Sequence, residues 1–150
     1  MEVKISKLSQ NDTTALKELL SVFEVVFEME PFIVPDDAYL RGLLLNPDMM
    51  FMVAEADGKV VGGLSAYVLA QYYSKEKHAY IHDVAISTAY QRKGIGKKLI
   101  AAFNNYCQTM NYAEVFVAAE KEDAHAVEFY RATGADELES VHFFYKLNSK

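Results

Sequence analysis

The chain has 150 residues, which fits one domain, and we expect a single domain over residues 1–150. Its 15 Lys and Arg stand against 21 Asp and Glu, so the net charge of −6 argues against nucleic-acid binding and is compatible with a cationic small partner. The single cysteine, Cys107, excludes an internal disulfide framework. The chain begins without an apolar leader, and its longest apolar stretch, 60–70, is too short to span a bilayer. We therefore expect a cytoplasmic domain that contacts no membrane.

The first third of the chain predicts a strand and two helices. Residues 3–6 alternate apolar and polar side chains, as a half-buried strand does. Apolar residues at helical spacing follow the N-cap candidates at 11–14 and predict a helix that ends near Phe27. Residues 28–37 contain two prolines and four acids and predict a loop. The loop leads into a short second helix, which is capped at its start near Asp36 or Asp37 and ends by 46–47.

The middle of the chain predicts three strands, over 50–56, 59–73 and 79–86. Asp57-Gly58 is a hairpin signal and should join the first two of these strands. The Gly62-Gly63 pair marks a bulge or a close approach of two backbones.

The last third predicts two helices and two or three strands. A helix follows residues 91–98, and 114–119 reads as a buried strand. Asp123 can cap a helix that stops at Gly134. Residues 135–147 alternate enough for one or two closing strands. The order predicts an α+β domain with a mixed, mostly antiparallel sheet.

Residues 91–98 combine two glycines with four cationic side chains between a strand and a helix. Gly94 and Gly96 let the backbone turn tightly and approach a ligand. The free N–H groups of the first helical turn and the helix dipole favour an anion there. We therefore expect a pyrophosphate site, and the alternative is a solvated basic helix start. The residues of this expected site are Gln91, Arg92, Lys93, Gly94, Ile95, Gly96 and Lys97.

This loop, together with the strand 81–86, resembles the acetyl-coenzyme A binding motif of the GCN5-related N-acetyltransferases (GNAT), which reads Gln/Arg-x-x-Gly-x-Gly/Ala. Residues 128–135, with the Phe129-Tyr130 pair and Gly134, resemble a later motif of the same superfamily. The resemblance covers nearly the whole chain. It implies a GNAT fold of about seven strands and about four helices, and acetyl-coenzyme A (acetyl-CoA) as the acetyl donor. Coenzyme A would also run along the strand before the loop, at Val84, Ala85 and Ile86.

Three segments, 65–69, 80–86 and 91–95, look like the class I aminoglycoside 3-N-acetyltransferases. That group has a tyrosine where this chain has His82, and its Gln-Ala-Asp appears here as Ala118-Ala119-Glu120. The likeness implies that the acceptor is the 3-amino group of an aminoglycoside antibiotic, and hence a role in drug resistance. Many members of the superfamily dimerise, so a homodimer is one option for the assembly.

Acetyl transfer to an amine needs a base, because a protonated amine is not a nucleophile. Asp83 is the only acid in the apolar run 80–86, where we expect it to be buried. Burial raises the pKa of a carboxyl group towards the range useful for a general base. The alternatives are an Asp83 satisfied by neighbouring N–H groups, and Glu120 as the base or as a contact to a second ammonium of the acceptor.

The resemblance implies two further catalytic roles. A backbone N–H after the acid, at Val84 or Ala85, stabilises the oxygen that becomes negative in the tetrahedral intermediate. Tyr130 matches the superfamily's general acid, which protonates the leaving thiolate. A tyrosine in the core of an amphipathic helix is the alternative reading of Tyr130.

Acidic residues gather in the connection between the first two helices, which borders the acceptor site in this superfamily. They form either a negative funnel for a cationic substrate or a charged surface that keeps the protein soluble. The expected substrate-binding residues are Glu28, Glu30, Asp36, Glu120 and Asp123. We expect no metal site, because His78 and His82 lie along a strand and would be roughly 13 Å apart.

The sequence thus predicts an acetyl-CoA-dependent N-acetyltransferase that acts by direct attack of a primary amine in a ternary complex. The first alternative is the same fold acting on another amine, such as a polyamine, an amino-acid derivative or a protein N-terminus. The second is a catalytically silent domain that binds coenzyme A.

Overall fold

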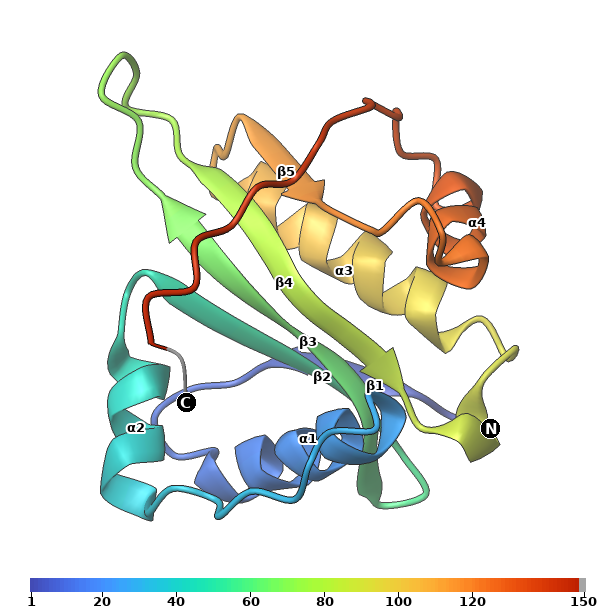
Figure 1. The fold of residues 1–150 in the computed structure, drawn as a ribbon. Coiled ribbons are helices and arrows are strands. Elements are labelled where there is room, and N and C mark those ends of the chain that lie inside the picture. Colours follow the sequence, from blue (N-terminus) through green and yellow to red (C-terminus); the bar gives the residue numbers. More distant parts are fainter. Residues whose placement is uncertain (149–150) are drawn as a thin grey trace. The chain divides into compact units, whose positions relative to one another are not determined.

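The computed structural model describes residues 1–148 as two compact parts, which divide at Ala118 and Ala119 (Figure 1). The first part holds a five-stranded sheet in the order β1-β2-β3-β4-β5. Its strands are β1 (Lys4–Lys7), β2 (Met49–Ala56), β3 (Lys59–Leu69), β4 (His78–Ile86) and β5 (Glu114–Val117). Its helices are α1 (Thr13–Val26), α2 (Asp37–Leu45), α3 (Ile95–Thr109) and the short 3₁₀ helix η1 (Thr88–Tyr90). The strands from β1 to β4 pair antiparallel, and β5 pairs parallel to β4.

Helices cover both faces of this sheet. Phe51, Val53 and Ala85 point to the face packed by α1 and α2, which we call the α1–α2 face. Ala54 and Val61 point to the opposite face, where the start of α3 packs, and we call it the α3 face. Figure 1 shows α1 and α2 on one side of the sheet and α3 on the other.

The expected backbone features of the β2–β3 hairpin are confirmed. Asp57 and Gly58 both have positive φ angles, 52° and 76°, as the tightest hairpin turns require. A Cβ on Gly63 would lie 2.5 Å from the carbonyl oxygen of Met52, so the backbones approach too closely for a larger residue. The β2–β3 register shifts next to Gly62, as a bulge does.

The second helix begins as the sequence predicts. Asp36 is its N-cap, and its Oδ1 accepts a hydrogen bond from the Tyr39 N–H at 2.9 Å. Lys17 of α1 pairs with Asp37 in the first turn at 2.5 Å. This contact lowers the pKa of Asp37 and ties the two helices together at the surface.

The second part is described from Ala119 onward and contains α4 (Ala124–Ala132). Asp123 caps this helix, because its Oδ1 accepts a hydrogen bond from the Ala126 N–H at 3.1 Å. Gly134 follows the helix with a φ of 90°, so the predicted stop is confirmed. Arg131 bonds to Glu137 at 2.8 Å and so ties the helix to the segment after it.

Several predictions about strands are wrong. The described residues form five strands, not about seven, and residues 135–147 form none. Alternating side chains show which residues could face a core, but they do not show whether the backbone has a partner strand to pair with. β3 ends at Leu69 instead of continuing to residue 73, and Tyr72 just beyond it is fully exposed. β5 is an edge strand, so it is only half-buried. In residues 1–148 no helix is long and apolar enough to cross a membrane.

Candidate active site

The edge of β4 that faces β5 is only partly paired. The parallel register runs from His78 with Glu114 to Ile81 with Val117, and β5 ends there. No described strand pairs with this edge of β4 over residues 82–86, which we call the free edge of β4. A free edge presents backbone donors and acceptors that a ligand can use.

Val84 and Ile86 turn their backbone groups into this free edge. The Ser87 N–H donates to the Val61 carbonyl at 2.7 Å, which fixes the phase of the β3–β4 ladder. Because backbone groups alternate between the two sides of an antiparallel strand, those of Val84 and Ile86 point away from β3. Gln91 confirms this direction, since its Nε2 donates to the Ile86 carbonyl at 2.8 Å. The Val84 N–H therefore points into the free edge.

The loop after β4 leads to the N-terminus of α3 with a backbone shape suited to an anion. Arg92 and Gly94 have φ angles of 60° and 79°, in the left-handed region, and Gly94 is the N-cap. Alternating left-handed residues direct successive N–H groups towards one point, and the first turn of a helix adds more free N–H groups. A Cβ on Gly94 would meet nothing within 4 Å, so no described atom crowds the backbone at this position.

Cations surround this loop, and no acidic residue lies in the first turn of α3. The expected cofactor residues Arg92, Lys93 and Lys97 are exposed, while Ile95 is buried and holds the helix against the sheet. The donors and charges fit a diphosphate such as that of coenzyme A.

Tyr90 contributes to the structure of the candidate site, and the sequence did not indicate this role. Its hydroxyl donates to the Asp57 carboxylate at 2.8 Å, which raises the pKa of Tyr90. The ammonium groups of Lys59 and Lys93 lie 5.5 Å and 5.8 Å from the centre of its ring. Tyr90 thus links the β2–β3 hairpin to the loop. Tyr90 and Asp57 are too far apart in the chain for local spacing to reveal the contact.

Asp83 is not buried, contrary to prediction: its side chain is 38% exposed. It pairs with Ser65 of β3 and shares the α1–α2 face with Ala85. His82 lies beside it, with 3.9 Å between His82 Nε2 and Asp83 Oδ2. Asp83 is therefore a candidate base because it lies next to the free edge, and not because it is buried. Val84 and Ile86 point to the α3 face.

The remaining predicted site residues are distributed over both parts. Glu28, Glu30 and Asp36 are exposed in the connection between α1 and α2, and Asp36 already caps α2. Glu120, Asp123 and Tyr130 belong to the second part. Asp123 caps α4, and the half-buried Tyr130 packs its ring edge-on against Phe129 at 5.1 Å.

A family model for the Acetyltransferase (GNAT) family matches residues 14–135. The chain belongs to this family. GNAT enzymes transfer an acetyl group from acetyl-CoA, and the free edge of β4 with the loop after it is the candidate place for that substrate in this GNAT chain.

Solved structures of aminoglycoside acetyltransferases are similar to this GNAT chain over nearly their whole length. The enzyme meta-AAC0020 from an uncultured soil metagenomic sample, in complex with trehalose, is 46% identical, with 97% of each chain covered and a TM-score of 0.93. A complex of the same enzyme with sisomicin is 45% identical, with the same coverage and TM-score. HMB0005, from an uncultured soil metagenomic sample, is 31% identical over 99% of this chain and 100% of that chain, with a TM-score of 0.91.

Curated relatives are more distant. The N-alpha-acetyltransferase of Sulfurisphaera tokodaii is 28% identical over 63% of this chain and 61% of that protein. Human N-acetyltransferase 8 is 26% identical over 66% of this chain and 50% of that protein. The chain therefore spans less than two thirds of the length of these two relatives.

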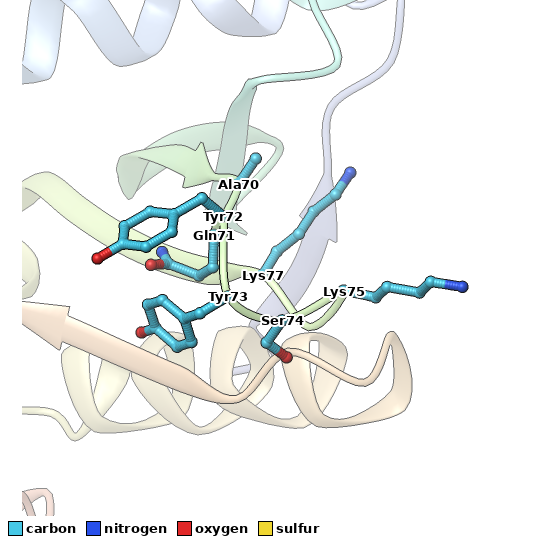
Figure 2. Close-up of a pocket in the computed structure, with 7 residues that line it drawn as sticks. All are labelled: Ala70, Gln71, Tyr72, Tyr73, Ser74, Lys75 and Lys77. Carbon is cyan, nitrogen blue, oxygen red and sulfur yellow. The ribbon is translucent and has the colours of Figure 1, made fainter.

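A recess of about 610 Å³ lies away from the free edge, in the loop between β3 and β4. Figure 2 shows the rings of Tyr72 and Tyr73 on one side of this loop, while Lys75 and Lys77 extend to the other side. A catalytic site needs polar groups that converge on one point, and these side chains diverge. The recess is therefore not the candidate active site.

In residues 1–148 no three His, Cys, Asp or Glu side chains gather in a way that could hold a metal ion. His78 instead pairs with Glu114, with 3.6 Å between Nδ1 and Oε2. Cys107 is buried in α3, and burial raises the pKa of its thiol to about 11.

Proposed function

We propose that residues 1–150 form one acetyl-CoA-dependent N-acetyltransferase domain that acetylates a primary amine of an aminoglycoside. The observation that carries the proposal is the 46% identity, over 97% of both chains, to an aminoglycoside acetyltransferase. The complex of that enzyme with sisomicin supports the same class of acceptor for this chain. The 3-amino group as the position of acetylation is proposed from the class I resemblance of residues 65–69, 80–86 and 91–95.

The loop and the free edge are proposed to hold the two ends of acetyl-CoA. The backbone N–H groups of residues 92–97 would bind the diphosphate, with Arg92, Lys93 and Lys97 adding positive charge. The backbone of Val84 and Ile86 would align the acyl arm along the free edge. At that position the Val84 N–H is placed to donate to the thioester oxygen as it gains negative charge.

The proposed chemistry is direct attack in a ternary complex. Asp83 would take a proton from the acceptor ammonium, because it is the carboxylate beside the free edge. Tyr130 would return a proton to the leaving thiolate, and Glu120 is the alternative acid–base group. Glu28, Glu30, Asp36, Glu120 and Asp123 would attract the other ammonium groups of the acceptor.

A second acceptor class is an α-amino group of a peptide. The likeness to the N-alpha-acetyltransferase of Sulfurisphaera tokodaii, at 28% identity, favours it. Acetylation of an aminoglycoside and acetylation of a peptide would use the same loop and the same free edge. The two functions would differ only in which acceptor fits against the α1–α2 face.

The proposal is tested by measuring the release of thiol from acetyl-CoA with each of four acceptors: sisomicin, gentamicin, spermidine and a short peptide. We expect rapid release with the two aminoglycosides, and NMR of the product should show the acetyl group on the 3-amino nitrogen. Acetylation at another amine of the aminoglycoside would reject the 3-amino position but keep aminoglycosides as the class of acceptor. Rapid release with the peptide alone would reject the aminoglycoside, and coenzyme A binding without turnover on any amine would indicate a silent binding domain.

A further inference from the structure

A β-bulge at His82 brings two neighbouring side chains to the same face of the sheet. Ser65 pairs with Asp83 while the next residue, Ala66, pairs with Ile81, so His82 is the extra residue of β4. Neighbouring residues of a regular strand point to opposite faces. A bulge changes this direction locally, and bulges often aim a side chain at a functional site.

The contacts of His82 show where its ring points. The ring lies edge-on to those of Tyr67 and Tyr80, with centroids 5.6 Å and 6.0 Å away. Tyr67 and Tyr80 pair with each other across β3 and β4, and by register they share the α1–α2 face with Asp83. His82 and Asp83 therefore stand side by side on that face.

The side chains of His82 and Asp83 lie close together, and that of His82 is the more exposed to water. His82 Nε2 lies 3.9 Å from Asp83 Oδ2, which is within reach of a hydrogen bond after a small rotation or through one water molecule. The side chain of His82 is 51% exposed, against 38% for Asp83. The ionisable groups that the structure records against His82 are Tyr67, Tyr80 and Asp83, of which Asp83 is the carboxylate.

We propose that His82 receives the acceptor's proton from Asp83 and passes it to solvent; this inference rests on the proposed function. An imidazole is a common proton carrier in enzymes, and here it stands beside the carboxylate that would take the proton first. In the balanced reaction the ammonium R–NH₃⁺ gives one proton to Asp83, and Asp83 gives it to the Nε2 lone pair of His82. The nitrogen lone pair of R–NH₂ forms the N–C bond, the C–S bond breaks, and a second amine proton ends on the coenzyme A thiolate. His82 finally releases its proton to water.

The other histidine of β4 offers a matched control. His78 also stands beside a carboxylate, with Nδ1 3.6 Å from Glu114 Oε2. It lies at the start of the strand, where β4 is paired on both sides, and four residues before the bulge. Loss of His78 therefore removes a histidine–carboxylate contact from the same strand without touching the free edge.

The experiment compares His82→Ala, His78→Ala and Asp83→Asn in thiol release with sisomicin, after thermal melting has shown that each variant is folded. We expect His82→Ala to lower kcat by about 10²-fold, the lower end of the effect of an acid–base group, with little change in the KM for acetyl-CoA. Added free imidazole should restore kcat to His82→Ala in proportion to its concentration, and should not restore it to Asp83→Asn. His78→Ala should retain the parent kcat.

A kcat of His82→Ala equal to that of the parent, or a loss that imidazole does not restore, would overturn the relay. A second measurement does not depend on turnover: at fixed pH, Asp83→Asn should move the NMR signals of the His82 ring more than those of the His78 ring. Equal movement of the two would also overturn the proposal. A parent that acetylates no amine would overturn the proposed function and the relay together, whereas an active parent with an unaffected His82→Ala overturns the relay alone.

Discussion

The backbone conformation of Gly94 makes a prediction that separates stability from ligand binding. Gly94 has a φ of 79°, in the left-handed region that costs a non-glycine residue about 1–2 kcal/mol. A Cβ there would meet nothing within 4 Å, so Gly94→Ala adds backbone strain without a clash. Gly58, in the β2–β3 hairpin, has a φ of 76° and equally open surroundings. Gly58→Ala is therefore a control of nearly equal cost.

The two variants should lose similar stability. For a chain of this size, 1 kcal/mol shifts Tm by about 2–4 °C, so each variant should melt about 2–8 °C below the parent. Only Gly94→Ala should also weaken coenzyme A binding, because relaxation of its strain turns the N–H groups of the loop away from the ligand. Loss of one hydrogen bond to a charged group costs about 1.5–3 kcal/mol, which corresponds to an increase in Kd of about 10- to 150-fold.

Calorimetric titration of coenzyme A into the three proteins measures this effect without an acceptor. If Gly94→Ala binds coenzyme A as tightly as the parent, the loop does not hold the diphosphate. If Gly58→Ala weakens coenzyme A binding to the same extent as Gly94→Ala, the loss follows stability and not the loop.

Three further predictions address the base, the sheet and the thiol. Asp83→Asn should lower kcat by about 10²–10⁴-fold while coenzyme A still binds, and an unchanged kcat in the thiol assay would remove Asp83 from the mechanism. Gly63→Ala should cost about 1–3 kcal/mol because its Cβ would lie 2.5 Å from the Met52 carbonyl oxygen, whereas Gly42→Ala in α2, with nothing within 4 Å, should gain up to about 1 kcal/mol. Urea unfolding compares the two, and equal midpoints would contradict the packing argument. Burial raises the pKa of Cys107 from 9.0 to about 11, so the unfolded chain releases this proton first and stability falls as pH rises through that range. Cys107→Ala should make the fall shallower, and parallel curves for variant and parent would show that the thiol does not contribute.

The sequence predicted those features that depend on neighbouring residues. The Asp57-Gly58 turn, the Asp36 cap and the stop at Gly134 each follow from the backbone preferences of one or two residues. The turn into α3 at Gly94 was also accessible, because glycines at the end of a strand have a local geometric meaning, while anion binding by this helix start stays a prediction.

The features that depend on distant partners were missed. An apolar run suggested that Asp83 is buried, but the bulge at His82 is visible only when β4 is aligned with β3. The contact between Tyr90 and Asp57 joins residues 33 positions apart, so no spacing rule could find it. Strands were overpredicted in 135–147 because alternating side chains say nothing about hydrogen-bonding partners.

The alternation of side chains along β4 has an evolutionary consequence. Asp83 points to the α1–α2 face, while Val84 and Ile86 turn towards α3 and the loop that precedes it. Under the proposed function, the surface that selects the amine and the surface that holds the acetyl donor lie on opposite sides of one strand. Substitutions on the first surface can broaden or narrow the set of antibiotics that are modified while the second stays intact. Selection by a new drug would therefore act on the part of the α1–α2 face away from His82 and Asp83, and resistance could change its spectrum without a loss of catalytic competence on the way.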